Sequence, residues 1–197
     1  MQVFIRMANV AYMMEDYTAV ADAAEKALMI DDKSVEALFF YAKACIGHGD
    51  TTNAVAMLTK AIGLKPDYAE AYLLRGETLL SAGETAEADE DACRLLKEHP
   101  DNEDILMLKA RIEKAKGNPA EAISYYSRVI DANPFNANAY RERGLLRIDN
   151  GDEGCGQADL KQAEELAEQQ NTGNEKQNIE NETKEKYKSI DPYGVFS

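Results

Sequence analysis

The chain has 197 residues, 45% of them apolar, so it is long enough to bury a sizeable core. Its 36 acidic and 22 basic residues give a net charge of -14, which disfavours nucleic acid and anionic membranes, because both require a concentrated Lys/Arg surface. The three cysteines are odd in number, which argues against a disulfide framework. No apolar stretch approaches the roughly 20 residues that span a bilayer. We therefore expect a cytoplasmic protein without membrane insertion, or alternatively an exported protein whose signal peptide has been removed.

The sequence is periodic, with a step of 34 residues. Two kinds of helix breaker recur at this spacing: Gly49, Gly83, Gly117, Gly151 and Pro66, Pro100, Pro134. Each glycine precedes Asp, Glu or Asn, which indicates the end of one helix and the start of the next. Each proline stands where a helix must already have ended, because it lacks a backbone N–H and clashes with the preceding turn. One repeat therefore holds two helices, and the expected repeats are about 1–34, 35–68, 69–102, 103–136 and 137–168.

Between these breakers the apolar residues keep helical spacing, as at Ala54, Leu58 and Ala61. Residues of similar size also recur in phase in all five repeats. An early large residue of the first helix is Phe4, Leu38, Tyr72, Leu106 or Tyr140. The small residue that follows it is Ala8, Ala42, Gly76, Ala110 or Gly144. In the second helix, the first crossing position is Val20, Ala54, Ala88, Ala122 or Gly156.

This pattern resembles the tetratricopeptide repeat, in which small residues stand where the two helices of a repeat cross. Helix axes about 8 to 10 Å apart leave no room there for long side chains. The resemblance covers residues 1–168 and implies an all-α fold. That fold is a right-handed α–α superhelical solenoid of about five TPR-like helical hairpins, plus a C-terminal capping helix or tail.

The sequence departs from the family pattern at a few positions. Asp32 replaces the closing proline of the first repeat, and Gly156 replaces an alanine within a helix. Glu113 and Arg147 stand where the family usually packs an aromatic residue. Because a buried charge needs a partner and a helical glycine costs about 1 kcal/mol, we expect the last two repeats to pack less tightly.

The resemblance also implies a binding face, since the first helices of such arrays line a concave inner surface. Large apolar side chains at these positions suit an extended segment or an amphipathic helix of a partner. The candidate groove residues are Ile5, Asn9, Tyr12, Phe39, Lys43, Ile46, Leu73, Glu77, Leu80, Met107, Arg111 and Arg141. The alternative for each large side chain is that it only completes the packing between repeats.

The expected function is a non-catalytic scaffold that binds a peptide or helix of a protein partner in this groove. One use of the resembled family is a two-carboxylate clamp, built from Lys, Asn and Arg side chains on three successive first helices. The best register here offers Asn9, then Phe40, then Glu70 and Leu74, so only Asn9 fits and Glu70 would repel a carboxylate. We therefore expect no such clamp.

An enzyme is the second function class, but the sequence offers little material for one. His48 and His99 stand at predicted helix ends, and neither has a cysteine or a second histidine at metal-ligand spacing. Cys45 falls on an apolar helix face, and Cys93 and Cys155 have no basic neighbour in sequence that indicates a lowered pKa. No catalytic residue, metal ligand or cofactor is predicted.

Two charged clusters have a structural and a functional interpretation. The acidic run of Glu84, Glu87, Asp89, Glu90 and Asp91 lacks the spacing of a calcium loop and is expected to be a solvated helix face. The basic cluster of Arg141, Arg143 and Arg147 is expected either to pair with Glu142 and Asp149 or to anchor an acidic part of the partner.

A third function class is self-assembly through the terminal repeats, which makes a homo-oligomer possible. No upstream helix covers Val3, Phe4, Met7 and Val10, so either this face pairs with another copy or further repeats precede residue 1. Residues 169–197 are expected to form a polar C-terminal helix and tail. A helix that caps the last repeat is favoured over a frayed tail. We expect the apolar end, residues 190–197, to dock in an apolar groove of its own chain or of a second copy.

Overall fold

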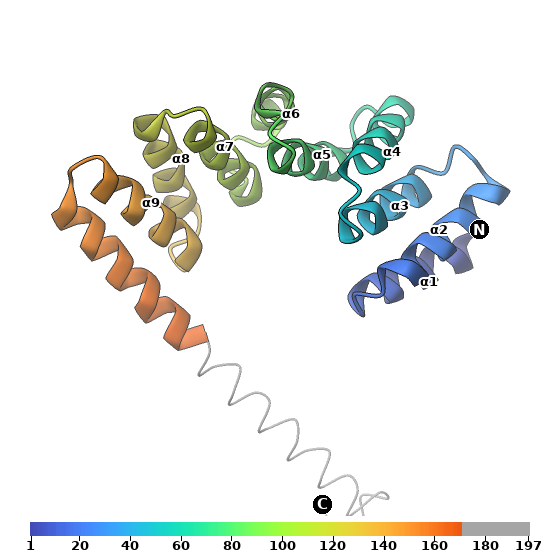
Figure 1. The fold of residues 1–197 in the computed structure, drawn as a ribbon, viewed down its shortest axis with the longest axis horizontal. Helices are drawn as coiled ribbons and strands as arrows, with labels where there is room; N and C mark the ends of the chain where they lie inside the picture. Colours follow the sequence, from blue (N-terminus) through green and yellow to red (C-terminus); the bar gives the residue numbers. More distant parts are fainter. Residues whose placement is uncertain (171–197) are drawn as a thin grey trace, which may run out of the picture. The chain divides into compact units, whose positions relative to one another are not determined.

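The computed structural model describes residues 1–170, which form ten α-helices and no strand (Figure 1). The first nine are α1 (Gln2–Met13), α2 (Tyr17–Ile30), α3 (Val35–Gly47), α4 (Thr51–Leu64), α5 (Ala69–Ser81), α6 (Thr85–Glu98), α7 (Glu103–Ala115), α8 (Pro119–Ala132) and α9 (Ala137–Asp149). The tenth covers residues 153–170. The predicted all-α helical repeat is confirmed. No helix within residues 1–170 is both long and apolar enough to cross a membrane.

The chain divides into two compact units, Met1–Arg128 and Val129–Ser197. The first unit holds α1 to α7 and most of α8, and the described part of the second holds the end of α8, α9 and the helix of residues 153–170. The predicted limit at residue 168 stays a prediction. The proposed capping helix and the docking of residues 190–197 lie outside the described residues.

The turns between the two helices of each repeat follow from their glycines. Gly49, Gly83, Gly117 and Gly151 have φ values between 77° and 88°, the left-handed region that glycine enters without a steric penalty. Glu15 takes this place in the first repeat with φ 57°, so the turn is kept although the glycine is missing. The 34-residue period therefore extends one repeat further back than the glycines alone indicate.

Several of the helix starts that the sequence predicted are capped by short polar side chains, whereas Tyr68 and Glu84, which precede α5 and α6, make no such cap. Asp50, next to Gly49, accepts a hydrogen bond from the backbone N–H of Asn53 at 3.1 Å. The same N-cap arrangement recurs at Asp16, Ser34, Asn102 and Asn136. Each cap satisfies a backbone donor that the first turn of a helix leaves without an intrahelical partner.

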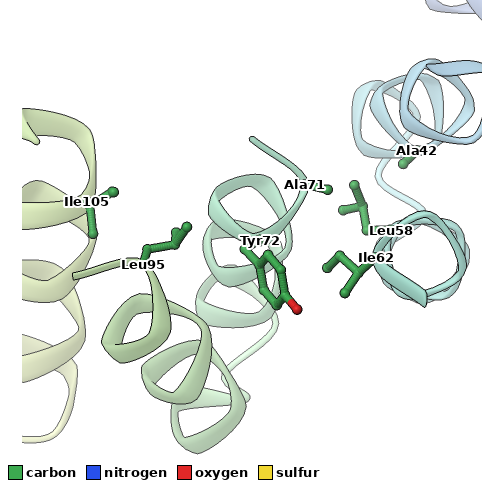
Figure 2. Close-up of a cluster of buried hydrophobic side chains, with 7 residues drawn as sticks. All are labelled: Ala42, Leu58, Ile62, Ala71, Tyr72, Leu95 and Ile105. Atoms are coloured by element: carbon green, nitrogen blue, oxygen red, sulfur yellow. The ribbon is translucent and has the colours of Figure 1, made fainter. Parts of the chain in front are cut away.

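The small crossing residues are buried as predicted. Ala8, Ala42 and Ala110 have no exposed surface, nor do the residues at the crossing positions of the second helices in the same repeats, Val20, Ala54 and Ala122. The apolar side chains then fill the space between repeats. In the first unit, Leu58 and Ile62 of α4 point toward Tyr72 of α5 in one such cluster (Figure 2). Leu95 of α6 and Ile105 of α7 belong to the same cluster.

The expectation of looser packing is wrong at the last crossing. A Cβ added at Gly156 would lie 2.8 Å from the carbonyl oxygen of Gly144 and 2.5 Å from Ile148 Cγ1. A Cβ at Gly144 would lie 2.9 Å from the Gly156 carbonyl oxygen. The two backbones therefore approach so closely that neither position has room for an alanine, and the cost of a helical glycine is offset by this close contact.

We predict that Gly156→Ala lowers the free energy of unfolding by about 1–3 kcal/mol, because overpacking outweighs the gain of about 1 kcal/mol in helix propensity. Gly154→Ala is the matched control, since it lies in the same helix with nothing within 4 Å of the added Cβ. It should raise stability by about 0.5 kcal/mol. Urea denaturation of both variants measures the two effects, and a stabilised Gly156→Ala variant would contradict the close crossing.

Candidate binding groove

The first helices of the repeats carry all of the predicted groove residues. Within the first unit, α1 contacts α3, and α5 contacts α7. None of the predicted residues is buried: Asn9, Arg111 and Arg141 are exposed, and the other nine are half-buried. Their small neighbours at the helix crossings are fully buried, so each first helix separates a packed face from a face that water can reach.

The structure brings three predicted residues together around one hollow of about 230 Å³. These are Tyr12 of α1 and Lys43 and Ile46 of α3. The remaining wall consists of Tyr17, Gly47 and Leu74, which sequence reasoning missed. The hollow therefore combines aromatic and aliphatic walls with one ammonium group.

Gly47 is the sequence signal that could have revealed this wall. A Cβ at position 47 would lie 2.2 Å from Tyr17 Cγ, so the ring of Tyr17 occupies the space that any other residue would fill. The same repeat position holds Met13, Ser81 and Ala115 in other repeats, so only the second repeat can accept a ring there.

Phe39 and Leu73 have a double role. Both pack against the buried cluster of Leu58, Ile62 and Tyr72, and the centroid of the Phe39 ring lies 5.2 Å from that of Tyr68. The alternative interpretation, packing between repeats, thus applies to part of their surface. Truncating either one is expected to cost stability, which makes them poor sites for a binding test.

The other predicted residues lie apart from the hollow. Glu77 of α5 is half-buried, and burial together with Asp104 raises its pKa, although Arg111 of α7 opposes this from 4.0 Å. Ile5, Leu80 and Met107 are half-buried on α1, α5 and α7. Arg141 belongs to the second unit, where its Nη2 donates to Asn138 Oδ1 at 2.8 Å.

The basic cluster has a partner that the sequence did not indicate. Arg143 and Arg147 both bind Asp159 of the helix of residues 153–170, with N–O distances of 2.7 and 2.8 Å. Asp159 is buried, so it needs these cations. Of the three arginines, only Arg141 is exposed enough to meet a partner.

The acidic run on α6 is a solvated face only in part. Asp91 is buried and accepts two hydrogen bonds from Arg75 of α5, at 2.6 and 2.8 Å. Asp89 binds Lys109 and Lys116, the latter at 2.6 Å. These partners lie on neighbouring helices, where sequence periodicity alone does not place them.

Lys109 joins Asp89 and Glu113 into one buried network. Its Nζ lies 2.8 Å from Glu113 Oε1 and 3.6 Å from Cys93 Sγ, so Cys93 does have a basic neighbour in space. Asn118 Nδ2 donates to Glu113 Oε2 at 2.8 Å. Burial opposes ionisation of Asp89 and Glu113, but the hydrogen bonds of the network hold the pKa of each carboxyl below its usual value. The charge of Glu113, expected to weaken packing, is thus fully partnered.

Residues 1–170 contain no group of three His, Cys, Asp or Glu side chains that could hold a metal ion. His48 and His99 follow the last residues of α3 and α6 as helix C-caps. Cys45 is buried in α3, whereas Cys93 and Cys155 are exposed.

Sequence profiles of known families identify the repeat. Two profiles, each described as a tetratricopeptide repeat, match residues 46–112 and 107–153, which together make up more than half of the chain. The chain belongs to the tetratricopeptide repeat family. The resemblance inferred from residue spacing is confirmed, and this family consists of protein-interaction scaffolds. A search of curated protein sequences finds no match to this tetratricopeptide repeat chain.

Solved structures share the tetratricopeptide fold over most of the chain. A crystal structure of MamA is 23% identical, covers 84% of this chain and 97% of its own, and has a TM-score of 0.74. MamA 41-end from Desulfovibrio magneticus RS-1 is 15% identical, with coverages of 86% and 96% and a TM-score of 0.77. YrrB, a TPR protein with an unusual peptide-binding site, is 16% identical, with coverages of 83% and 84% and a TM-score of 0.67. At these identities the likeness shows the fold alone.

The lowered pKa of Asp89 predicts a pH-dependent stability. A carboxyl whose pKa is depressed by folding contributes stability above its unfolded pKa, about 4, and loses it as the pH falls through the folded value. We expect the thermal midpoint of Asp89→Asn to fall less steeply than that of the wild type between about pH 5 and pH 2. Glu98→Gln, an exposed position on the same helix, should leave the slope unchanged. Equal slopes of thermal midpoint against pH for all three proteins would show that ionised Asp89 does not stabilise the fold through this network.

Proposed function

We propose that the exposed face of the first helices binds an extended segment or an amphipathic helix of a partner protein. The observation that carries this proposal is the hollow formed by Tyr12, Lys43 and Ile46. It lies on the solvent-accessible face of the first helices, whose opposite face is fully buried at the helix crossings. A surface that combines apolar anchors with a few polar groups suits peptide recognition. Membership of the tetratricopeptide repeat family supports a protein-interaction scaffold. The peptide-binding site of YrrB supports, by analogy, a peptide as the ligand.

A non-catalytic role agrees with the chemistry at hand. Within residues 1–170 the titratable groups that are brought together, such as Asp89 with Lys109 and Asp159 with Arg143, are ion pairs between helices. Each pair keeps a buried charge compensated, so removing one partner alone would destabilise the array. The lining of the hollow contributes one lysine and two tyrosines, and the ring of His48 packs edge-on against Tyr17 with the centroids 6.3 Å apart.

A photo-cross-linking amino acid at Ile46 tests the groove without truncating the core. Ile46 lines the hollow, so cross-linking in an extract of the source cell is expected to yield a defined covalent adduct with a protein partner. The same amino acid at Lys60, exposed on α4, is the matched control and should yield none. Mass spectrometry of the adducts measures both, and equal labelling from the two positions would contradict a groove-specific partner.

Self-assembly is a second candidate function, favoured by the apolar face of α1. Val3 and Val10 are 68% and 56% exposed, whereas residues at the same repeat positions, such as Ala37 and Ala44, are buried. In the later repeats of the first unit the second helix of the preceding repeat covers these positions, since α2 contacts α3 and α4 contacts α5. The α1 face forms a hollow of about 530 Å³ that includes Met7 and Met14, and a helix of a second copy would fit the same packing scheme.

Light scattering over a concentration series tests self-assembly. The apparent mass of the wild type should rise with concentration, and Met7→Glu with Val10→Glu should keep it at the mass of one chain, because two buried carboxylates would have no partner. Met29→Glu, at a position that is 84% exposed on α2, is the control and should behave like the wild type. A wild type that stays monomeric at every concentration would exclude this candidate.

A further inference from the structure

Lys43 has an unusual environment within the groove. Its ammonium nitrogen lies 4.0 Å from the centroid of the Tyr12 ring, 4.9 Å from that of Phe39 and 5.7 Å from that of Phe40. The three rings come from α1 and α3, so the contact joins the first two repeats. Cation–π contacts of this kind hold the ammonium in place at the edge of the hollow.

The ammonium has no anionic partner in the described part of the chain. Lys43 makes neither a hydrogen bond nor an ion pair there, although the protein carries 36 acidic residues. Three other cations of the first helices do have an anionic partner. Arg111 pairs with Glu77, Lys109 with Asp89, and Arg75 with Asp91. Burial partly desolvates this charge and lowers the pKa of Lys43, and the rings rather than an anion offset the desolvation.

The walls beside this ammonium limit what could meet it. Ile46, Leu74 and the ring of Tyr12 offer apolar surface, and Gly47 leaves room for the ring of Tyr17. The volume of about 230 Å³ is below the roughly 300–1,000 Å³ of small-molecule sites, and it suits one or two side chains of a peptide. The occupant should therefore carry an anion directly beside an apolar side chain.

We propose that Lys43 binds a single Asp or Glu carboxylate of the partner segment while a neighbouring apolar side chain of that segment fills the hollow beside it. This inference rests on the proposed peptide-binding function and adds a specificity to it. The carboxylate of the partner supplies the anion that residues 1–170 do not, and it accepts a charge-assisted hydrogen bond from the ammonium. Hydrogen-bond donors that are already held in position also lower the entropy cost of binding.

One carboxylate is expected rather than a run of them. Glu77 on α5 is half-buried on the same face, and the net charge of -14 repels further acids. This site also differs from the two-carboxylate clamp, because it uses one lysine among aromatic rings and no Asn or Arg side chain. Specificity then comes from the spacing between the acid and the apolar anchor.

A displayed library of random peptides, selected on the full chain, tests the inference without a known partner. Peptides enriched by the wild type should carry Asp or Glu at one fixed distance from an aromatic or aliphatic residue. Selection on Lys43→Met should lose the acid and keep the apolar residue, and selection on Lys43→Glu should exchange the acid for Lys or Arg. Lys60→Met, exposed on α4, is the control and should select the same peptides as the wild type.

A synthetic copy of one enriched peptide then measures how much the acid contributes to the binding affinity. Replacing its acid by Asn or Gln should weaken binding to the wild type about tenfold by calorimetry, and should leave binding to Lys43→Met unchanged. Circular dichroism checks that each variant remains helical. Enriched peptides that lack an acid and bind all variants equally would overturn the inference and leave the groove intact. If no peptide is enriched by any variant, both the groove and the inference are wrong.

Discussion

The close approach of helices within each repeat is the constraint on which the rest of the structure depends. Where the axes cross, the residues are Ala or Gly, with Val20 the largest at the positions named above, and at Gly144 and Gly156 even a methyl group has no room. Large side chains are consequently displaced to the spaces between repeats or to the exposed face of the first helices. The core in Figure 2 and the candidate groove are thus two outcomes of one restriction on side-chain size.

Buried charge has a defined place in this arrangement. Asp91 and Asp159 lie inside, where an isolated carboxylate would be costly, and each is met by an arginine of the adjacent first helix. Lys109 serves both Asp89 and Glu113, which lets α6 and α7 share one polar contact. Against this background of paired ions, Lys43 differs because its half-buried ammonium lies against three rings, whereas Lys65, whose ammonium meets the ring of Tyr68, is exposed.

Sequence spacing predicted the helices, their turns and their crossings because these depend on local chemistry. A glycine with positive φ, a capping Asp and a small residue at the crossing can each be recognised from one position and its neighbours. The ion partners of Asp91 could not be found this way, since Arg75 lies on another helix and its side-chain direction depends on the crossing. The groove residues on the first helices were predicted from repeat phase, but Tyr17 lies on a second helix, and the family resemblance assigns the groove to the first helices.

The pairing of Arg75 with Asp91 returns two repeats later as Arg143 with Asp159, and the repeat between them breaks the series. There Lys109 faces the ring of Tyr125 at 5.9 Å, and no carboxylate occupies the position of Asp91. Both partners of each Arg–Asp pair lie within one repeat, so loss or gain of a whole 34-residue unit by unequal recombination would leave these pairs together. The contact of Lys109 with Asp89 instead joins two successive repeats, so separating this couple would leave a buried lysine and Asp89 without each other.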